Sequence, residues 1–403
     1  MRLSTNTIHE QGVTTILKHQ ETLHHLQQQV STGRRVLSPS DDPVAAALAL
    51  DVTQASALNT QYAENRTAAT NQLGFVEGVM DGITNLLQNV QTAAVSAGNA
   101  SLNDADRLSI ARELRGRFNE LLGFANSTDA SGQFLFSGFQ GATKPFTQTA
   151  AGVQYNGDQG ERQIQISASR QIATNSSGTA LFERIKNGNG VFVTNANPTN
   201  TGSGVIDTGS VVSPANLTGN NYQISFTVAS GVTTYEVTNT TTGAVLSTGN
   251  PFTSDEVINF DGIQFSIKGE PANGDQFSVT PSTNQSLFDT IDNLINVLST
   301  PVSGQTGGST QLTNGLNSAL RDLDNSLDHV LTIRASIGVR LQEIDVLQGV
   351  GEETEIQLQH NLSQLQEVDL FKAISDLNKQ RVFLEAAQRS FATVSELSLF
   401  DFI

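Results

Sequence analysis

The 403-residue sequence contains no cysteine and no tryptophan. Without cysteine there are no disulfide bonds, no thiolate catalysis and no Cys-ligated metal centre. Basic residues are scarce: 22 Lys and Arg stand against 39 Asp and Glu, which gives a formal net charge of -17. Because nucleic acid and anionic lipid are both bound through basic surfaces, we expect neither nucleic acid nor a membrane as a partner.

Long hydrophobic runs are also missing. No apolar stretch approaches the length of a membrane-spanning helix, and the polar start Met1-Arg2-Leu3-Ser4 lacks the apolar region of a secretory signal peptide. These features predict a protein that is cytosolic or that leaves the cell without a cleaved signal.

Two heptad patterns, one toward each end of the chain, are the main positive signal. An apolar repeat of 3.5 residues kept over such a length predicts helical rods that lie along other helices. The predicted rod core is Leu73, Val76, Met80, Ile83, Leu87, Val90, Leu316, Leu323, Val330, Ile337 and Ile344. The first pattern starts earlier, with Leu48, Val52, Ala55, Tyr62 and Ala69. Only Asn59, Arg66 and Arg334 interrupt the two repeats.

Weaker stripes precede the first rod and follow the second. We expect a helix from about Ile8 to Val30 and a last helix that starts after a weak hinge at Gly349 to Glu353. The predicted assembly positions are Ile16, Leu23, Leu26, Val30, Leu370, Ile374, Leu377, Leu384, Phe391 and Val394. Short helices are marginal in water, so we predict that these ends are frayed in the monomer and order only against neighbouring molecules.

Helix-start signals precede the first rod. Asp42 is a good N-cap, and Pro43 suits the first helical turn, where its missing N–H costs nothing. A further helix after Asn103 is expected to pack antiparallel on the first rod. Its predicted stripe is Leu108, Ala111, Phe118, Leu122 and Ala125.

The middle of the chain, about 145–283, changes to a period of two and is predicted to be β-rich. Asp261-Gly262 is a strong hairpin signal, and Asn156-Gly157 and Asn273-Gly274 are similar. The stretch Asn195 to Gly204 has a composition typical of disorder.

Together these patterns predict a multidomain α + β protein, in which a long coiled-coil bundle built from both termini carries an inserted β-rich outer domain. The terminal helices, 1–38 and 355–403, would form an inner assembly domain. Residues 39–184 and 285–354 would form the helical rod domain with a β-hairpin, and 185–284 the outer domain.

No residue pattern points to catalysis, a metal or a cofactor. His19, His24 and His25 share one helix but lack the spacing and third ligand that zinc needs. The neighbouring carboxylates of Asp41 and Asp42 are explained by helix capping. We therefore expect a protein that is not an enzyme and that binds no cofactor.

Several segments together resemble the bacterial flagellin superfamily and, within it, the hook-associated protein 3 family. After the start Met1 to Thr5, the segment from Val30 to Pro43 contains Ser31-Thr32-Gly33-Arg34-Arg35 and Pro39-Ser40-Asp41-Asp42-Pro43, which is similar to a family motif. Further similarities are Phe136-Ser137-Gly138, Lys144-Pro145-Phe146, Tyr155-Asn156-Gly157-Asp158 with Arg162 to Ile166, and the ending Leu397 to Ile403.

The resemblance implies a structural adaptor of the flagellum, assembled from several copies of the chain into a ring. The implied partners are hook-associated protein 1 on the hook side, flagellin on the filament side, and an export chaperone that holds the C-terminal helices. It also implies an extracellular location, reached through the flagellar type III apparatus without a cleaved signal. A filament flagellin and a surface coiled-coil adhesin or binding module are the alternatives.

Overall fold

The computed structural model describes residues 5–396. Residues 1–4 and 397–403, which carry the start and ending motifs of the family resemblance, lie outside the described residues. Contacts divide the chain into two compact units. The first holds 5–66, Ile166–Ala168 and 345–396, and the second holds Thr67–Gln165 and Ser169–Ile344.

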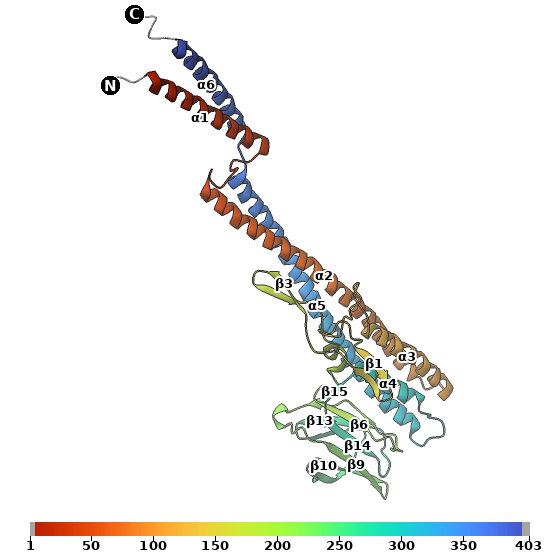
Figure 1. Ribbon diagram of the computed structural model, residues 1–403. Helices are drawn as coiled ribbons and strands as arrows, with labels where there is room; N and C mark the ends of the chain where they lie inside the picture. The colour runs from red at the N-terminus through yellow and green to blue at the C-terminus, as the bar shows by residue number, and fades with distance from the viewer. Residues whose placement is uncertain (1–4, 397–403) are drawn as a thin grey trace, which may run out of the picture. The chain divides into compact units, whose positions relative to one another are not determined.

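Apart from the end of the second rod, the helices begin and end close to the predicted places (Figure 1). They are α1 (Thr5–Thr32), α2 (Pro43–Ala97), α3 (Asp104–Ala125), α4 (Leu287–Ser299), α5 (Gly308–Gln366) and α6 (Leu370–Glu396), with a π-helical turn η1 (Thr179–Glu183) and a 3-10 turn η2 (Pro214–Asn216). Long helices from both ends of the chain therefore enclose a β-rich middle, and the predicted α + β class is confirmed.

Helices of the second unit approach closely at glycines. A Cβ atom added to Gly82 of α2 would lie 2.7 Å from Cζ of Phe124 in α3, and one added to Gly315 of α5 would lie 2.9 Å from Val297 in α4. All the predicted rod-core residues are buried in this unit, with at most 5% of any of them exposed.

The stripe predicted for α3 is wrong in part. Leu108 is 37% exposed, and Arg107 takes the buried face instead. The Arg107 side chain donates to the carbonyl oxygen of Leu102 at 2.7 Å and to Asp104 at 2.8 Å, so the buried charge has partners. Asn103 caps the helix by accepting from the N–H groups of Ala105 and Asp106.

An aromatic cluster packs α4 against the segment that follows α3, and the ring of Phe118 in α3 lies 5.9 Å from that of Phe288. The rings of Phe136, Phe146, Phe182 and Phe288 lie with centroids 5.0–5.7 Å apart. Beside them, burial raises the pKa of Tyr155 to about 12. Aromatic side chains bury large areas and contribute strongly to such a core.

The strands form hairpins and a two-layered sandwich. β1 (Phe146–Thr149) pairs with β2 (Gly152–Tyr155), β3 (Gln163–Ser167) pairs with β4 (Arg170–Ala173), and β5 (Ile185–Lys186) pairs with β15 (Asn284–Gln285). One layer has the order β11 (Ala244–Pro251), β10 (Val232–Asn239), β9 (Tyr222–Ala229), β14 (Gln276–Pro281) and β6 (Phe192–Ala196). The other has β12 (Val257–Phe260), β13 (Ile263–Lys268) and β7 (Val205–Ile206), and β8 (Ser210–Val211) also pairs with β13.

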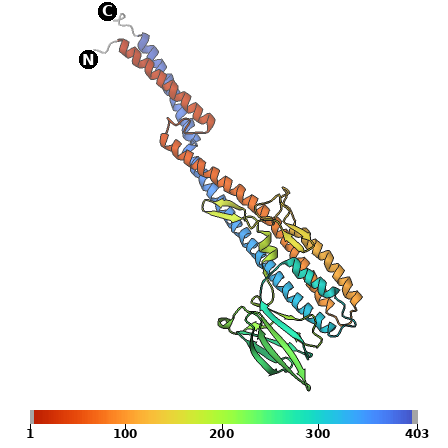
Figure 2. The same cartoon turned by 60° about the horizontal axis from the view of Figure 1, so that its bottom comes forward.

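The sandwich has its own apolar core, and Figure 2 shows its strands together in green. The core residues include Tyr222, Ile224, Phe226, Val237, Ile258, Phe265, Ile267, Phe277 and Val279. They alternate along their strands with polar residues, as expected for sheets with one face in the core.

Two of the three predicted hairpin turns are wrong. Asp261-Gly262 does join the paired strands β12 and β13. Asn273-Gly274 instead connects β13 to β14, which belong to different layers, and Asn156-Gly157 follows a hairpin rather than closing one. A dipeptide sets a local turn, whereas strand pairing depends on which faces are buried.

The predicted disorder between Asn195 and Gly204 is also wrong. Asn200 is buried, and its side-chain amide donates to the carbonyl oxygen of Gln276 at 2.7 Å. The side chain of Gln311 in α5 donates to the carbonyl oxygen of Asn200 at 3.0 Å. Tertiary hydrogen bonds therefore order a segment whose composition alone suggests flexibility.

The hinge predicted at Gly349 to Glu353 is absent, because α5 runs through it without a break. The interruption lies further on, between the end of α5 at Gln366 and the start of α6 at Leu370. Asp369 caps α6 by accepting from the N–H of Lys372 at 3.1 Å.

Candidate assembly site

The terminal helices α1 and α6 lie side by side in the first unit (Figure 1). A Cβ atom added to Gly12 would lie 2.6 Å from the ring of Phe391, and the ring of His9 stands 4.9 Å from that ring. Further along α1, the side-chain amide of Gln380 lies 2.7 Å from Nδ1 of His19. Residues 9 and 12 of α1 meet residue 391 of α6, and residue 19 meets residue 380. The two helices therefore run antiparallel.

The predicted assembly positions divide into two groups. Seven are half-buried: Ile16, Leu23, Leu26, Val30, Leu377, Leu384 and Phe391. The other three, Leu370, Ile374 and Val394, are 46–49% exposed. A pair of helices can bury only one stripe of each, so apolar side chains off that stripe stay exposed.

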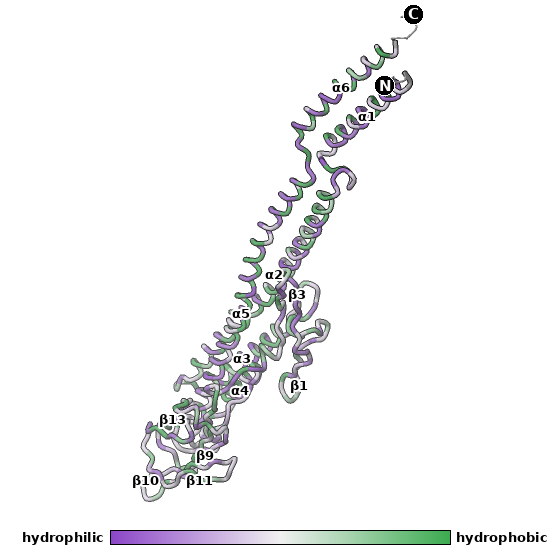
Figure 3. Tube along the Cα trace, turned by 90° about the vertical axis from the view of Figure 1, so that its left-hand side faces the viewer, coloured by the Kyte–Doolittle hydropathy of each residue, from purple (hydrophilic) through white to green (hydrophobic). Residues whose placement is uncertain are grey.

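More apolar side chains are exposed on α1 and α6, at positions outside the predicted assembly positions. Leu17 is 58% exposed, Val382 58%, Phe383 53% and Phe371 92%. Figure 3 shows apolar positions recurring along both helices. Large exposed apolar groups in this number are typical of an interaction surface.

The predicted cap at the start of α2 is in place. The N–H of Ala45 donates to Oδ1 of Asp42 at 3.0 Å, and Pro43 is the first residue of the helix. This hydrogen bond, and then the guanidinium of Arg35, lower the pKa of Asp42. The N–H groups of Ser38 and Leu37 likewise lower the pKa of Asp41.

Within the first unit, α2 and α5 meet through a polar layer. Ser56 donates to Glu355 at 2.7 Å, and the side chain of Asn59 donates to the carbonyl oxygen of Gly351 at 2.9 Å and to Glu355 at 3.1 Å. The hydroxyl of Ser56, followed by the amide of Asn59, lowers the pKa of Glu355. A polar layer in a helical seam fixes which residues face each other.

Arg66, the second interruption of the heptad pattern, is only 3% exposed. Its Nε donates to Gln348 at 2.8 Å, and its Nη1 donates to the carbonyl oxygen of Ile166 in β3 at 2.9 Å. Burial lowers the pKa of this guanidinium. The third interruption, Arg334, pairs with Glu77 and Asp81 of α2 in the second unit, at 2.6 and 2.8 Å.

The start of the first heptad pattern is largely exposed. Leu48 is 48% exposed and Ala55 is exposed, whereas Ala45 and Ala49 are buried. Val44, Leu48, Ala55 and Leu58 lie on a second heptad stripe, which is interrupted by Asp51 and which we call the outer stripe. Val44 is 70% exposed and Leu58 51%, so the outer stripe is uncovered in the part of the chain that the structure describes.

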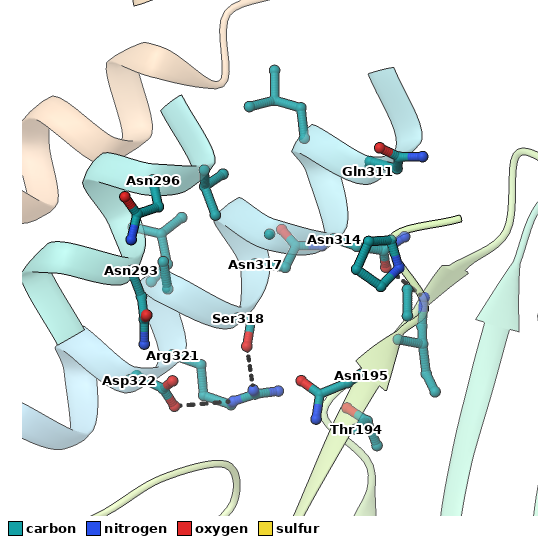
Figure 4. Close-up of a pocket in the computed structure, with 18 of the residues that line it drawn as sticks. Thr194, Asn195, Asn293, Asn296, Gln311, Asn314, Asn317, Ser318, Arg321 and Asp322 are labelled. Atoms are coloured by element: carbon teal, nitrogen blue, oxygen red, sulfur yellow. Dashed lines mark hydrogen bonds and ion pairs between the residues drawn. The ribbon is translucent and has the colours of Figure 1, made fainter. Parts of the chain in front are cut away.

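A cleft of about 940 Å³ lies in the second unit, between α4, the start of α5 and the strands β6 and β7 (Figure 4). In it Arg321 donates to Ser318 at 2.8 Å and lies 3.7 Å from Asp322, whose pKa is raised by burial. Nearby, Asn314 of α5 accepts from the N–H of Ile206 at 3.1 Å. The contact between Asn314 and Ile206 ties the sandwich to α5.

Residues 5–396 contain no group of three or more His, Cys, Asp or Glu side chains that could hold a metal ion. Over the same residues, no helix has both the length and the apolar character needed to cross a membrane.

Comparisons with known proteins agree with this architecture. The family described as the bacterial flagellin N-terminal helical region matches residues 3–141, and the D2-like domain of flagellar hook-associated protein 1 matches residues 194–281. The sequence in the crystal structure of FlgL from Xanthomonas campestris is 32% identical to this chain. The aligned region covers 77% of this chain and 99% of the Xanthomonas chain, with a TM-score of 0.71. The chain belongs to the flagellar hook-associated protein 3, or FlgL, family.

Other members of the FlgL family match along their full length. The flagellar junction protein FlgL from Legionella pneumophila is 28% identical, with 79% of this chain and 100% of that chain covered and a TM-score of 0.71. Flagellar hook-associated protein 3 of Salmonella typhimurium is 28% identical over 401 residues, which is 100% of this chain and 99% of its own. The chain is thus a flagellar, flagellin-like protein, and its relatives are structural proteins.

Proposed function

We propose that this chain is a structural adaptor, which joins the hook side of the bacterial flagellum to the flagellin filament by assembling with its own copies into a ring. The observation that best supports this proposal is the outer stripe of α2. A heptad stripe of apolar residues suits another helix, and the family membership makes a neighbouring subunit the natural source of that helix.

The α1/α6 pair would extend the same assembly. Its exposed apolar residues would form weak helix–helix contacts with several neighbouring subunits. We expect the ends of the pair to become ordered in those contacts. In this proposal, residues 1–38 and 355–403 are the inner assembly domain, 39–184 and 285–354 the rod domain, and 185–284 the outer domain.

The proposed neighbours are hook-associated protein 1 on the hook side and flagellin on the filament side. The chain matches a flagellin helical region and a hook-associated protein 1 domain. These matches support the proposal that its neighbours in the flagellum have related folds. An export chaperone would bind the C-terminal helices, and the chain would reach the cell exterior without a cleaved signal. The role is non-catalytic, as the structural relatives imply.

A filament flagellin is less well supported. The phase 1 flagellin of Salmonella naestved matches over 135 residues, which is 34% of this chain and 27% of that protein. Hook-associated protein 3 of Salmonella typhimurium matches over the whole chain.

The test is complementation of a strain that lacks the gene. We expect that strain to have hooks without filaments and to shed flagellin into the medium, and we expect the wild-type gene to restore filaments. Filaments that are normal in its absence would contradict the proposed function.

The outer stripe is tested in the same strain. Leu48→Gln together with Leu58→Gln should leave the purified chain folded but fail to restore filaments. Leu50 is the matched control, because it is 65% exposed on α2 but lies off the outer stripe. Leu50→Gln should restore filaments; equal activity of both variants would remove the outer stripe from the assembly surface.

A further inference from the structure

The connection between α1 and α2 is hydrogen-bonded to the connection between α5 and α6. The N–H of Arg35 donates to the carbonyl oxygen of Gln366 at 2.7 Å, and the N–H of Val368 donates to the carbonyl oxygen of Gly33 at 3.0 Å. Between them, Arg34 and Glu367 form an antiparallel bridge. We call this paired segment, 33–35 with 366–368, the joint.

The side chain of Arg35 bonds to two helix ends. Its Nη2 donates to the carbonyl oxygen of Leu365 at 2.9 Å, and its Nη1 donates to Oδ2 of Asp42 at 3.0 Å. Leu365 lies in the last turn of α5, where carbonyl groups lack a helical donor, and a cation is favoured by the helix dipole there. Asp42 is the N-cap of α2. One guanidinium therefore connects the end of α5 to the start of α2.

The main chain of Arg35 is tied to α1 as well. The side-chain amide of Gln29, in the last turns of α1, donates to the carbonyl oxygen of Arg35 at 2.6 Å. His25, one turn earlier, lies 3.3 Å from Asp41 in the loop before α2. Gly33 has a φ of 71°, in the left-handed region that favours glycine, and this conformation lets the chain turn directly after α1.

We propose that Arg35 is a positioning residue, which fixes the direction in which the α1/α6 pair leaves the ends of α2 and α5. This inference rests on the proposed function, because a fixed direction matters when the pair must meet a neighbouring subunit. The Arg35 and Asp42 side chains are 44% and 33% exposed, so their ion pair contributes little to stability. Its role is geometric, and only a forked guanidinium can hold both acceptors at once.

The absence of cysteine makes a direct test practical. Cysteines placed at Gln27 of α1 and Gln54 of α2, both exposed, would carry spin labels, and double electron–electron resonance on the purified full chain would give the distance distribution. We expect a narrow distribution with Arg35 in place. Arg35→Gln should broaden it at least twofold, and Arg35→Lys should also broaden it, because a single ammonium cannot reach both Leu365 and Asp42.

Arg34→Gln is the matched control, because Arg34 joins the bridge through its main chain only and should keep the narrow distribution. The midpoint of thermal unfolding should stay within about 2 °C for all three variants, which separates positioning from a loss of stability. A distribution that is broad with Arg35 present, or that stays narrow in Arg35→Gln, would overturn the proposal. The distance between the labels is measured on the purified chain, whereas filament growth is measured in cells. A failure of the positioning proposal is therefore distinguishable from a failure of the proposed function.

Discussion

The ring of Phe391 lies directly over the backbone of Gly12, so that a Cβ atom at Gly12 would stand 2.6 Å from Cδ2 of the ring. This contact joins residue 391 of α6 to residue 12 of α1, which are 379 positions apart in the sequence. Glycine in a helix costs about 1 kcal/mol relative to alanine. Here the cost is offset by the close approach of the ring.

The first prediction concerns this pair. Gly12→Ala should speed amide hydrogen exchange in α1 and α6 at least threefold, because the ring must move away although alanine favours the helix. Phe391→Leu in the same chain should restore the slower exchange, since a smaller side chain leaves room. Gly74→Ala is the control, because apart from its chain neighbours and the adjacent backbone of α2 nothing lies within 4 Å of its added Cβ. If Gly12→Ala slows exchange, the two helices do not pack in this way.

The second prediction compares two glycines of α5. A Cβ atom at Gly351 would lie 2.3 Å from Nη2 of Arg66, whereas one at Gly349 would meet nothing within 4 Å. The Arg66 guanidinium is buried and bonded to Gln348 and Ile166, so moving it aside would break those bonds. Gly351→Ala should therefore destabilise the chain by about 1–3 kcal/mol, and Gly349→Ala should stabilise it by up to about 1 kcal/mol. Urea unfolding measures both.

A double variant isolates the cause of the Gly351 effect. With Arg66→Met in place the guanidinium is gone, so Gly351→Ala should no longer cost stability. An unchanged cost in that background would mean that Gly351 matters for another reason.

The same two glycines show what the sequence could not reveal. A glycine pair in a heptad helix suggested a hinge, but Gly351 provides space for Arg66, which lies far away in the sequence. Asn200 is a similar case, because its polar surroundings suggested disorder and its contacts with Gln276 and Gln311 are tertiary. Local composition carries no information about such partners.

The rods were more accessible to sequence reasoning. Leu73, Met80 and Leu87 follow one apolar stripe that keeps its heptad spacing, so periodicity was enough to select residues that are buried. Around Leu48 the helix carries two stripes, and the intramolecular one contains small or polar residues such as Ala49, Ser56 and Asn59. A prediction based on hydrophobicity therefore chose residues of the exposed stripe. Only the structure shows which of the two stripes packs on α5.

The third prediction concerns acid. The pKa values of Asp41 and Asp42 are lowered in the folded chain, by the N–H of Ser38 and by the N–H of Ala45 respectively. Carboxyls whose pKa is lower in the folded than in the unfolded state contribute stability fully above the ordinary pKa of about 3.9. Below that value the unfolded chain takes up protons first, and the contribution falls until the folded carboxyls are protonated too.

The midpoint of thermal unfolding, followed from pH 6 down to pH 2, measures this loss. We expect the decline to begin near pH 4 and to be shallower in the double variant Asp41→Asn, Asp42→Asn. Asparagine keeps the capping acceptor but does not titrate in this range. His25 and Arg35 face the two carboxyls and are left unchanged in the double variant. An identical slope in the double variant would place the acid sensitivity elsewhere.

The fourth prediction separates folding from assembly. Leu87 and Leu323 are 1% and 2% exposed in the second unit, so replacing either with alanine should cost about 2–5 kcal/mol and lower the unfolding midpoint. Leu23 and Leu384 are only half-buried, in the α1/α6 pair. Leu23→Ala and Leu384→Ala should leave the second unit as stable as in the wild type and still block filament growth. Because all four changes remove the same atoms from a leucine, the difference must come from the place of each residue in the fold. Filaments that grow normally with Leu384→Ala would show that the terminal pair is not the surface on which assembly depends.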